Sequence, residues 1–114
     1  MTLPAAELAG FCAEVEARVL AARPGATLLL FGHVGDGNVH VNVVGPPADD
    51  DEVDDMVLGL VVERGGSISA EHGIGTLKRR WLARDRSPGE VAAMAAIKRA
   101  LDPDGILNPG VLLP

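Results

Sequence analysis

Residues 31–40 read FGHVGDGNVH, and this stretch decides the fold class. Its Asp36-Gly37 pair lies between two apolar runs. Such a pair is a strong short-range signal for a β-hairpin, because a type I′ turn requires positive φ at both central residues. A turn centred on this pair predicts that His33 lies opposite His40. Directly opposed residues have Cβ atoms roughly 4.5–5.5 Å apart, so we expect two imidazoles close enough to bind one metal ion or one substrate.

The same register sorts the hairpin into two faces, because successive side chains of a strand alternate between them. We expect the apolar face to pack on a core and the polar face to form a site. The polar face is predicted to carry Phe31, His33, His40 and Asn42, and the apolar face Leu30, Val34, Val39, Val41 and Val43.

The rest of the chain shows mostly helical periodicity, with apolar residues at i, i+3, i+4 and i+7. The last helix has a clear start, because Ser87 and Glu90 form an S-x-x-E capping box around Pro88. The expected elements are a helix over 4–21, strands over 26–33 and 39–44, a helix over 50–64, a weak strand over 67–70, a short basic helix over 76–83, a helix from Ser87 to about Asp102, and an apolar tail over 105–114 that packs on something.

That order predicts an α+β fold, an antiparallel sheet with helices packed on one face. Two good strands make a poor sheet alone. The missing strands are expected from the weak 67–70 segment, from another chain, or from sequence beyond these 114 residues.

Length and composition narrow the class of protein. At 114 residues the chain is one domain or part of one, and its 47% hydrophobic content excludes a disordered chain. The net charge of −6 argues against nucleic acid or an anionic membrane as a partner. Cys12 is the single cysteine, so we expect a buried thiol and no intrachain disulfide. With no signal peptide and no apolar run long enough to span a bilayer, we expect a cytoplasmic location.

A second group of reactive residues is Glu71-His72. A carboxylate held near two histidines completes a His-His-Glu set, and three protein ligands with an open fourth position are the usual arrangement of catalytic zinc. Manganese or iron takes the same ligand types, so the metal stays open. We expect His72 to point away from Glu71 and to act as a base or to orient a substrate. The distance from Glu71 to the hairpin depends on the fold and does not follow from the sequence.

Three motifs stand out along the chain: FGHVGDGNVHVNV at 31–43, GGSISAEHGIGTLKRRWL at 65–82 and IKRALDPDGILNPG at 97–110. Together they resemble the C-terminal part of the FAD-linked oxidase and dehydrogenase family, of the D-2-hydroxyglutarate dehydrogenase, D-lactate dehydrogenase and glycolate oxidase flavoprotein subunit type. Their order and spacing agree with the family, and the resemblance spans nearly the whole chain from about residue 26.

The resemblance implies both fold and roles. It implies a partial ferredoxin-like substrate (cap) domain, FAD in the complete enzyme, and a divalent metal that is often zinc. A metal polarises the hydroxyl and carboxylate of the substrate, while the flavin takes the hydride. The implied residues are His33, His40 and Glu71 as metal ligands, His72 as the base and a substrate contact, Asn42 as a substrate contact, and Asn108 as a cofactor contact.

The family's FAD-binding domain is not part of residues 1–114, so these residues correspond to the C-terminal portion of the substrate and metal domain. Val111 also departs from the family, because many relatives have lysine after NPG. That departure bears on the contact of the tail near the flavin. Because residues 1–114 do not include the FAD-binding domain, we expect no FAD on this chain alone, and an FAD-binding domain or subunit as its partner.

The leading hypothesis is the substrate- and metal-binding portion of an FAD-dependent enzyme that oxidises a small D-2-hydroxy acid to the 2-oxo acid, inactive alone. Two alternatives stay open. One is a non-catalytic module that binds a metal or a small carboxylate. The other is a structural fragment that forms a homodimer through its sheet edges, because an unpaired edge invites association.

Overall fold

The structure is a computed structural model that describes residues 1–47 and 50–113. It divides the chain into two compact units, Met1–Ala70 and Glu71–Pro114, which we call the N-terminal and the C-terminal unit. The expected α+β class is confirmed. The elements are α1 (Ala5–Ala22), β1 (Thr27–Phe31), the 3₁₀ helix η1 (Val34–Asp36), β2 (His40–Val44) and α2 (Asp51–Glu63) in the N-terminal unit, and the 3₁₀ helix η2 (Arg79–Trp81), α3 (Leu82–Asp85) and α4 (Pro88–Leu101) in the C-terminal unit.

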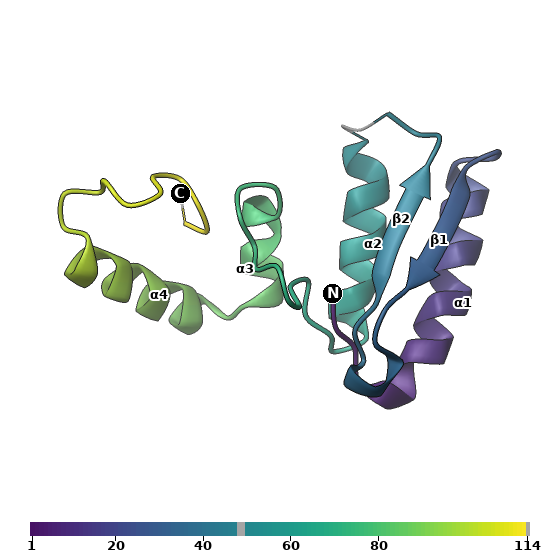
Figure 1. Ribbon diagram of the computed structural model, residues 1–114, viewed down its shortest axis with the longest axis horizontal. Helices are drawn as coiled ribbons and strands as arrows, with labels where there is room; N and C mark the ends of the chain where they lie inside the picture. Colours follow the sequence, from purple (N-terminus) through teal and green to yellow (C-terminus); the bar gives the residue numbers. More distant parts are fainter. Residues whose placement is uncertain (48–49, 114) are drawn as a thin grey trace. The chain divides into compact units, whose positions relative to one another are not determined.

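Helices α1 and α2 lie behind the two-stranded antiparallel sheet of the N-terminal unit, and the open face of the sheet is toward the viewer in Figure 1. The two amphipathic helices expected from periodicity are confirmed, although Cys12 and Met56 are only half-buried. Each fully buried side chain of this size contributes about 1.5–3 kcal/mol. The buried stripe consists of Leu8, Phe11, Val15 and Val19 on α1 and Val53, Val57, Leu58, Leu60 and Val61 on α2.

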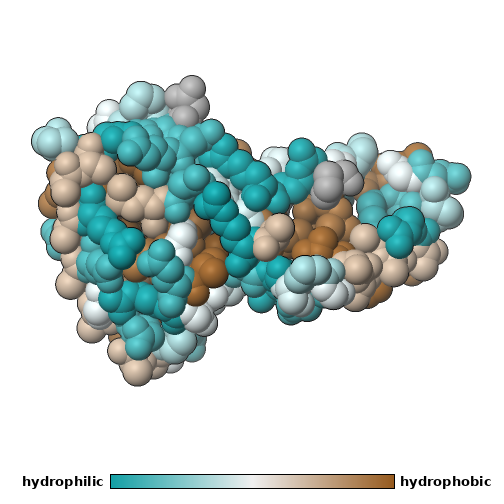
Figure 2. Space-filling view, turned by 180° about the vertical axis from the view of Figure 1, so that it is seen from behind, coloured by the Kyte–Doolittle hydropathy of each residue, from teal (hydrophilic) through white to brown (hydrophobic). Residues whose placement is uncertain are grey.

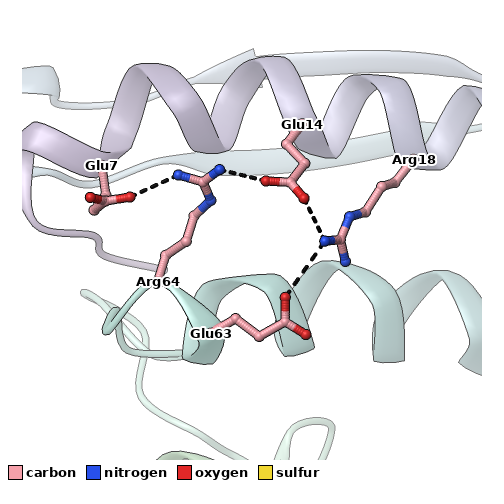
Figure 3. Close-up of polar contacts among 5 residues, drawn as sticks. All are labelled: Glu7, Glu14, Arg18, Glu63 and Arg64. Atoms are coloured by element: carbon pink, nitrogen blue, oxygen red, sulfur yellow. Dashed lines mark hydrogen bonds and ion pairs between the residues drawn. The ribbon is translucent and has the colours of Figure 1, made fainter.

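A chain of ion pairs joins α1 to α2 (Figure 3). Arg64, just after α2, donates hydrogen bonds to Glu7 at 2.7 Å and to Glu14. Arg18 donates to Glu14 and lies 3.6 Å from Glu63. The hydrogen bonds from Arg64, and then those from Arg18, hold the pKa of the Glu14 carboxyl below its usual range. Because these groups are partly solvent-exposed, the pairs contribute more to helix alignment than to stability.

The predicted hairpin is present, but its register and its turn differ from the expectation. The turn centred on Asp36-Gly37 predicts His33 opposite His40, whereas Phe31 is the residue that pairs with His40. The predicted register is therefore wrong by two residues. Because side chains alternate with a period of two, a shift of two leaves each strand residue on its predicted face.

The first three residues explain the wider connection between the strands, because they pair with residues 37–39. Val39 N donates a hydrogen bond to the Met1 carbonyl oxygen at 3.0 Å, and Leu3 N donates to the Gly37 carbonyl oxygen at 2.9 Å. Thr2 also forms a single antiparallel bridge to Ser67, which is all that the structure shows of the weak strand expected over 67–70. Residues 37–39 are thus hydrogen-bonded to residues 1–3, and η1 forms part of the connection between β1 and β2.

Gly37 is needed where residues 1–3 pack against the loop, and it does not form a type I′ turn. Its φ is +67°, in the left-handed region that glycine enters at little cost. A Cβ atom at this position would lie 2.0 Å from the Leu3 carbonyl oxygen. Glycine is therefore required both by the backbone conformation and by the segment that passes over it.

The C-terminal unit begins with a loop and ends in a capped helix. The capping box of α4 is confirmed: Glu90 N donates to Ser87 Oγ at 3.3 Å, and Ser87 N donates to Glu90 Oε2 at 2.8 Å. The basic helix expected over 76–83 starts later, as η2 followed by α3. Gly73 and Gly75, with φ of +71° and +59°, keep the preceding segment out of a helix.

Apolar side chains are exposed on the surface of the C-terminal unit (Figure 2). In the part of the chain that the structure describes, no residue of α4 is buried, and Leu101 is 76% exposed. An apolar groove of about 360 Å³ separates α4 from the tail. The expectation that the tail packs is met in part, because Leu112 and Leu113 are half-buried while Ile106 is 75% exposed. Among residues 1–47 and 50–113, no helix is long and apolar enough to cross a membrane.

Candidate functional site

The open face of the N-terminal sheet carries the polar side chains expected at a site. His40 and Asn42 lie two residues apart on β2 and therefore point to the same face. Their cross-strand partners are Phe31 and Leu29, which are 55% and 50% exposed. A few polar groups among exposed apolar side chains are the usual lining of a small-molecule site. This face is therefore the candidate binding surface of the N-terminal unit.

His40 stacks on Phe31, with ring centroids 5.0 Å apart and an angle of 14° between the ring planes. Such a contact orients the imidazole plane. His33 lies just before η1, where its carbonyl oxygen accepts hydrogen bonds from Asp36 N and Asn38 N at 3.0 and 3.1 Å. The predicted opposition of His33 and His40 across a tight turn is therefore wrong. Both histidines nevertheless belong to one short segment of the N-terminal unit, on either side of its connecting loop.

Glu71 and His72 lie in the glycine-rich loop that opens the C-terminal unit. The side chains are 48% and 80% exposed, and His72 Nε2 lies 3.9 Å from Glu71 Oε2. The expectation that His72 points away from Glu71 is therefore wrong. This separation is too long for a hydrogen bond, so the two side chains are neighbours and the imidazole stays accessible to solvent.

The donor types are those of a divalent metal site, since imidazole nitrogen and carboxylate oxygen both bind zinc. Among the described residues of either unit, however, no three His, Cys, Asp or Glu side chains gather as a ligand group. The predicted ligands are divided between the units, with His33 and His40 in one and Glu71 in the other. The chemistry of the set fits a metal, and its assembly remains a matter of proposal.

Asn108 lies in the tail of the C-terminal unit, in the left-handed region with φ of +47°. The preceding turn is organised by Asp102, whose carboxylate accepts hydrogen bonds from Ile106 N and Leu107 N, each at 3.0 Å. Lys98 donates hydrogen bonds to Asp102 and to the Leu107 carbonyl oxygen. The Lys98 hydrogen bond, above all, holds the pKa of the Asp102 carboxyl below its usual range.

Sequence reasoning missed this function of Asp102. It treated Asp102 only as the end of the last helix, although the side chain is 97% buried. The signal was present, because Lys98 and Asp102 are four residues apart and face each other on a helix. A carboxylate followed by Pro and Gly also favours a turn in which the side chain binds backbone amides.

The comparison with known proteins decides the family. Residues 1–112 match the family model described as FAD linked oxidases, C-terminal domain. The chain belongs to this family of FAD-linked oxidases. A D-2-hydroxyglutarate dehydrogenase of Stutzerimonas stutzeri (strain A1501) is 44% identical over an alignment of 108 residues. The alignment covers 88% of this chain and 23% of that protein.

Two further FAD-linked relatives extend the comparison. The mitochondrial D-2-hydroxyglutarate dehydrogenase of Arabidopsis thaliana is 43% identical over an alignment of 97 residues that covers 78% of this chain and 16% of that protein. Glycolate oxidase subunit GlcD of Escherichia coli (strain K12) is 43% identical over an alignment of 88 residues that covers 72% of this chain and 18% of that protein. The chain thus spans less than a quarter of the length of these relatives.

Membership in the FAD-linked oxidase family confirms the resemblance drawn from the three motifs. It connects the chain to FAD-dependent oxidoreductases.

Proposed function

We propose that this chain is the substrate- and metal-binding part of an FAD-dependent dehydrogenase or oxidase that converts a small D-2-hydroxy acid to the 2-oxo acid. The observation that carries the proposal is the family match over residues 1–112. Relatives named D-2-hydroxyglutarate dehydrogenase, 44% and 43% identical to this chain, support the substrate class. The chain spans less than a quarter of these relatives. We therefore expect an FAD-binding domain or subunit as partner and no turnover by these residues alone.

The proposal assigns His33, His40 and Glu71 as the ligands of a divalent metal. Two imidazoles and a carboxylate match catalytic zinc with an open fourth position, and manganese or iron would accept the same ligands. The stacking of His40 on Phe31 supports a ligand role, because a ring held in one plane loses less freedom when it binds. A bound metal would supply Lewis-acid polarisation of the substrate oxygens.

The proposal assigns His72 as the base that removes the proton from the substrate hydroxyl. Its high exposure supports this role, because the ring is accessible to a substrate. Asn42, on the open face of the sheet, would donate its amide to a substrate oxygen. Asn108 would contact the flavin, and a bound FAD would supply the hydride acceptor that the oxidation of the substrate needs.

Metal content tests the assignment of ligands on the chain itself. After dialysis against Zn²⁺, we expect about one bound Zn²⁺ per chain by atomic absorption. His33→Ala, His40→Ala and Glu71→Gln should each lower this content, and His72→Gln should retain it because His72 is not assigned as a ligand. Equal zinc content in all five proteins, or none in the wild type, would remove the metal from the proposal.

A non-catalytic binding module is the strongest alternative, and metal content does not distinguish it because such a module would also bind the metal. The module would, however, leave every D-2-hydroxy acid unreacted even when an FAD-binding partner is present. Reduction of the flavin of that partner decides between the two.

A further inference from the structure

The loop that carries Glu71 and His72 is tied to the tail of the same unit by two hydrogen bonds. Leu112 N donates to the Gly75 carbonyl oxygen at 3.2 Å, at the end of the loop. Arg79 Nη1 donates to the Gly110 carbonyl oxygen at 2.7 Å. Arg79 follows the loop by four residues, so one bond joins the tail to the loop itself and the other joins it to the turn of 3₁₀ helix that follows.

The tail adopts an unfavourable backbone conformation where it meets the loop. Leu112 has φ of +68°, and it and Asn108 are the two non-glycine residues with positive φ in the described part of the chain. The left-handed conformation is disfavoured for a bulky residue such as leucine, and it persists only where surrounding contacts impose it. The residue under strain is the one whose N–H binds Gly75, and Arg79 holds the chain two residues earlier.

The other end of the tail is fixed independently. The Asp102 carboxylate binds Ile106 N and Leu107 N, and Lys98 binds the Leu107 carbonyl oxygen. The tail therefore runs from an anchor on α4 to an anchor at Arg79. Around the Gly110 anchor, Val111 N donates to the Asn108 carbonyl oxygen at 3.2 Å and closes a turn.

We propose that Arg79 is a positioning residue: by binding the Gly110 carbonyl oxygen it keeps Leu112 on Gly75, and the tail thereby sets the geometry of the Glu71-His72 loop. The inference rests on the proposed function, since it matters to chemistry through the ligand and base roles of Glu71 and His72. It adds Arg79 and the tail to the parts of the chain on which the site depends. Arg79 itself touches neither substrate nor metal in this assignment.

Amide exchange on the ¹⁵N-labelled chain tests the mechanical part directly. We expect Arg79→Met to speed Leu112 N–H exchange roughly tenfold, the factor that one charge-assisted hydrogen bond represents, and to increase the mobility of Gly73 and Gly75. Arg79→Lys should restore most of the wild-type behaviour because lysine can still donate. Arg99→Met, which removes an exposed arginine from α4, should change neither. Unchanged Leu112 exchange in Arg79→Met would overturn the proposal.

Cobalt binding tests the consequence for the site. With Co²⁺ as the probe metal, we expect Arg79→Met to weaken binding about tenfold and to shift the visible absorption bands, since groups that orient a ligand typically change metal affinity by this much. Arg79→Lys should recover both. A loosened loop with unchanged Co²⁺ affinity and spectrum would overturn the positioning role. Absence of Co²⁺ binding by the wild type would overturn the metal assignment of the proposed function, and the exchange data would still decide whether Arg79 holds the loop.

Discussion

The two units of this chain keep their shapes by different means. The N-terminal unit buries a continuous apolar stripe from two helices, whereas, among the described residues, α4 of the C-terminal unit buries none of its side chains. The C-terminal unit buries Trp81 and Leu82 just before α4, and its capped helix and tail are held by polar contacts: a capping box, the Asp102 carboxylate and the Arg79 hydrogen bond. His40 and Asn42 therefore lie on a strand supported by a core, and Glu71 and His72 lie on a loop held by hydrogen bonds. Mutations should lower the stability of the whole N-terminal unit, whereas in the C-terminal unit they should loosen only the backbone near the mutated residue.

The largest effect is expected from Phe11→Ala. Phe11 has no exposed surface, and truncation of a fully buried phenylalanine costs about 3–5 kcal/mol through lost burial and a residual cavity. Urea unfolding followed by circular dichroism measures the loss. Leu20→Ala on the same helix, at a residue that is 38% exposed, is the matched control and should cost much less. Equal losses in both variants would show that the stripe of α1 is not the core.

Gly37→Ala is expected to destabilise the N-terminal unit by about 2 kcal/mol or more, because the new Cβ meets the Leu3 carbonyl oxygen and φ is left-handed. Gly35→Ala in the same loop has open space around its Cβ and serves as the control. Urea midpoints of the two variants give the comparison. Similar midpoints would mean that residues 1–3 do not cross Gly37 in solution.

In the C-terminal unit, Ser87→Ala removes the side-chain cap of α4. The expected loss is about 1 kcal/mol, because Glu90 N loses its acceptor, Ser87 Oγ, and the same hydroxyl no longer donates to Glu90 Oε2. Amide exchange in the first turn of α4 measures it, with exchange in α2 as the internal reference. Exchange that accelerates equally in α2 would contradict the local character assigned to this unit.

The smallest effect is expected from acid, and it should be confined to the tail. The pKa of Asp102 is lowered in the folded chain by Lys98, so its contribution is present above its ordinary value of 3.8 and is lost as pH falls through the lower, folded-state pKa. Amide exchange of Ile106 and Leu107 should accelerate over that range, corrected for the pH dependence of intrinsic exchange. Asp102→Asn should show faster exchange already at neutral pH, and Asp104→Asn should behave as the wild type. Unchanged exchange of both amides in Asp102→Asn would show that Asp102 does not anchor the tail.

Local signals predicted most of the elements. The three long helices, α1, α2 and α4, follow from apolar spacing, and the capping box of α4 follows from Ser87 with Glu90, because these contacts are made within a few residues. The turn failed for the opposite reason. Residues 1–3 pair with residues far along the chain, and a segment of three residues carries no periodicity that would reveal it.

The candidate site divides in the same way. Alternation along β2 is a local property, so the shared face of His40 and Asn42 was predictable. The position of His33 depended on the turn and was predicted wrongly. The contact between the tail and the Glu71 loop joins residues more than thirty positions apart through backbone carbonyl oxygens, which leave no signature in the side-chain sequence.

A chimera tests the central claim most directly. The matching 108 residues of the Stutzerimonas stutzeri D-2-hydroxyglutarate dehydrogenase are replaced by this chain, and bleaching of the bound flavin is followed anaerobically after addition of a panel of D-2-hydroxy acids. The account predicts that at least one of these acids reduces the flavin, and that His72→Gln slows the reduction by about a hundredfold or more while FAD stays bound. A folded, FAD-loaded chimera whose flavin stays oxidised with every acid would contradict it, as would full reduction rates in the His72→Gln chimera.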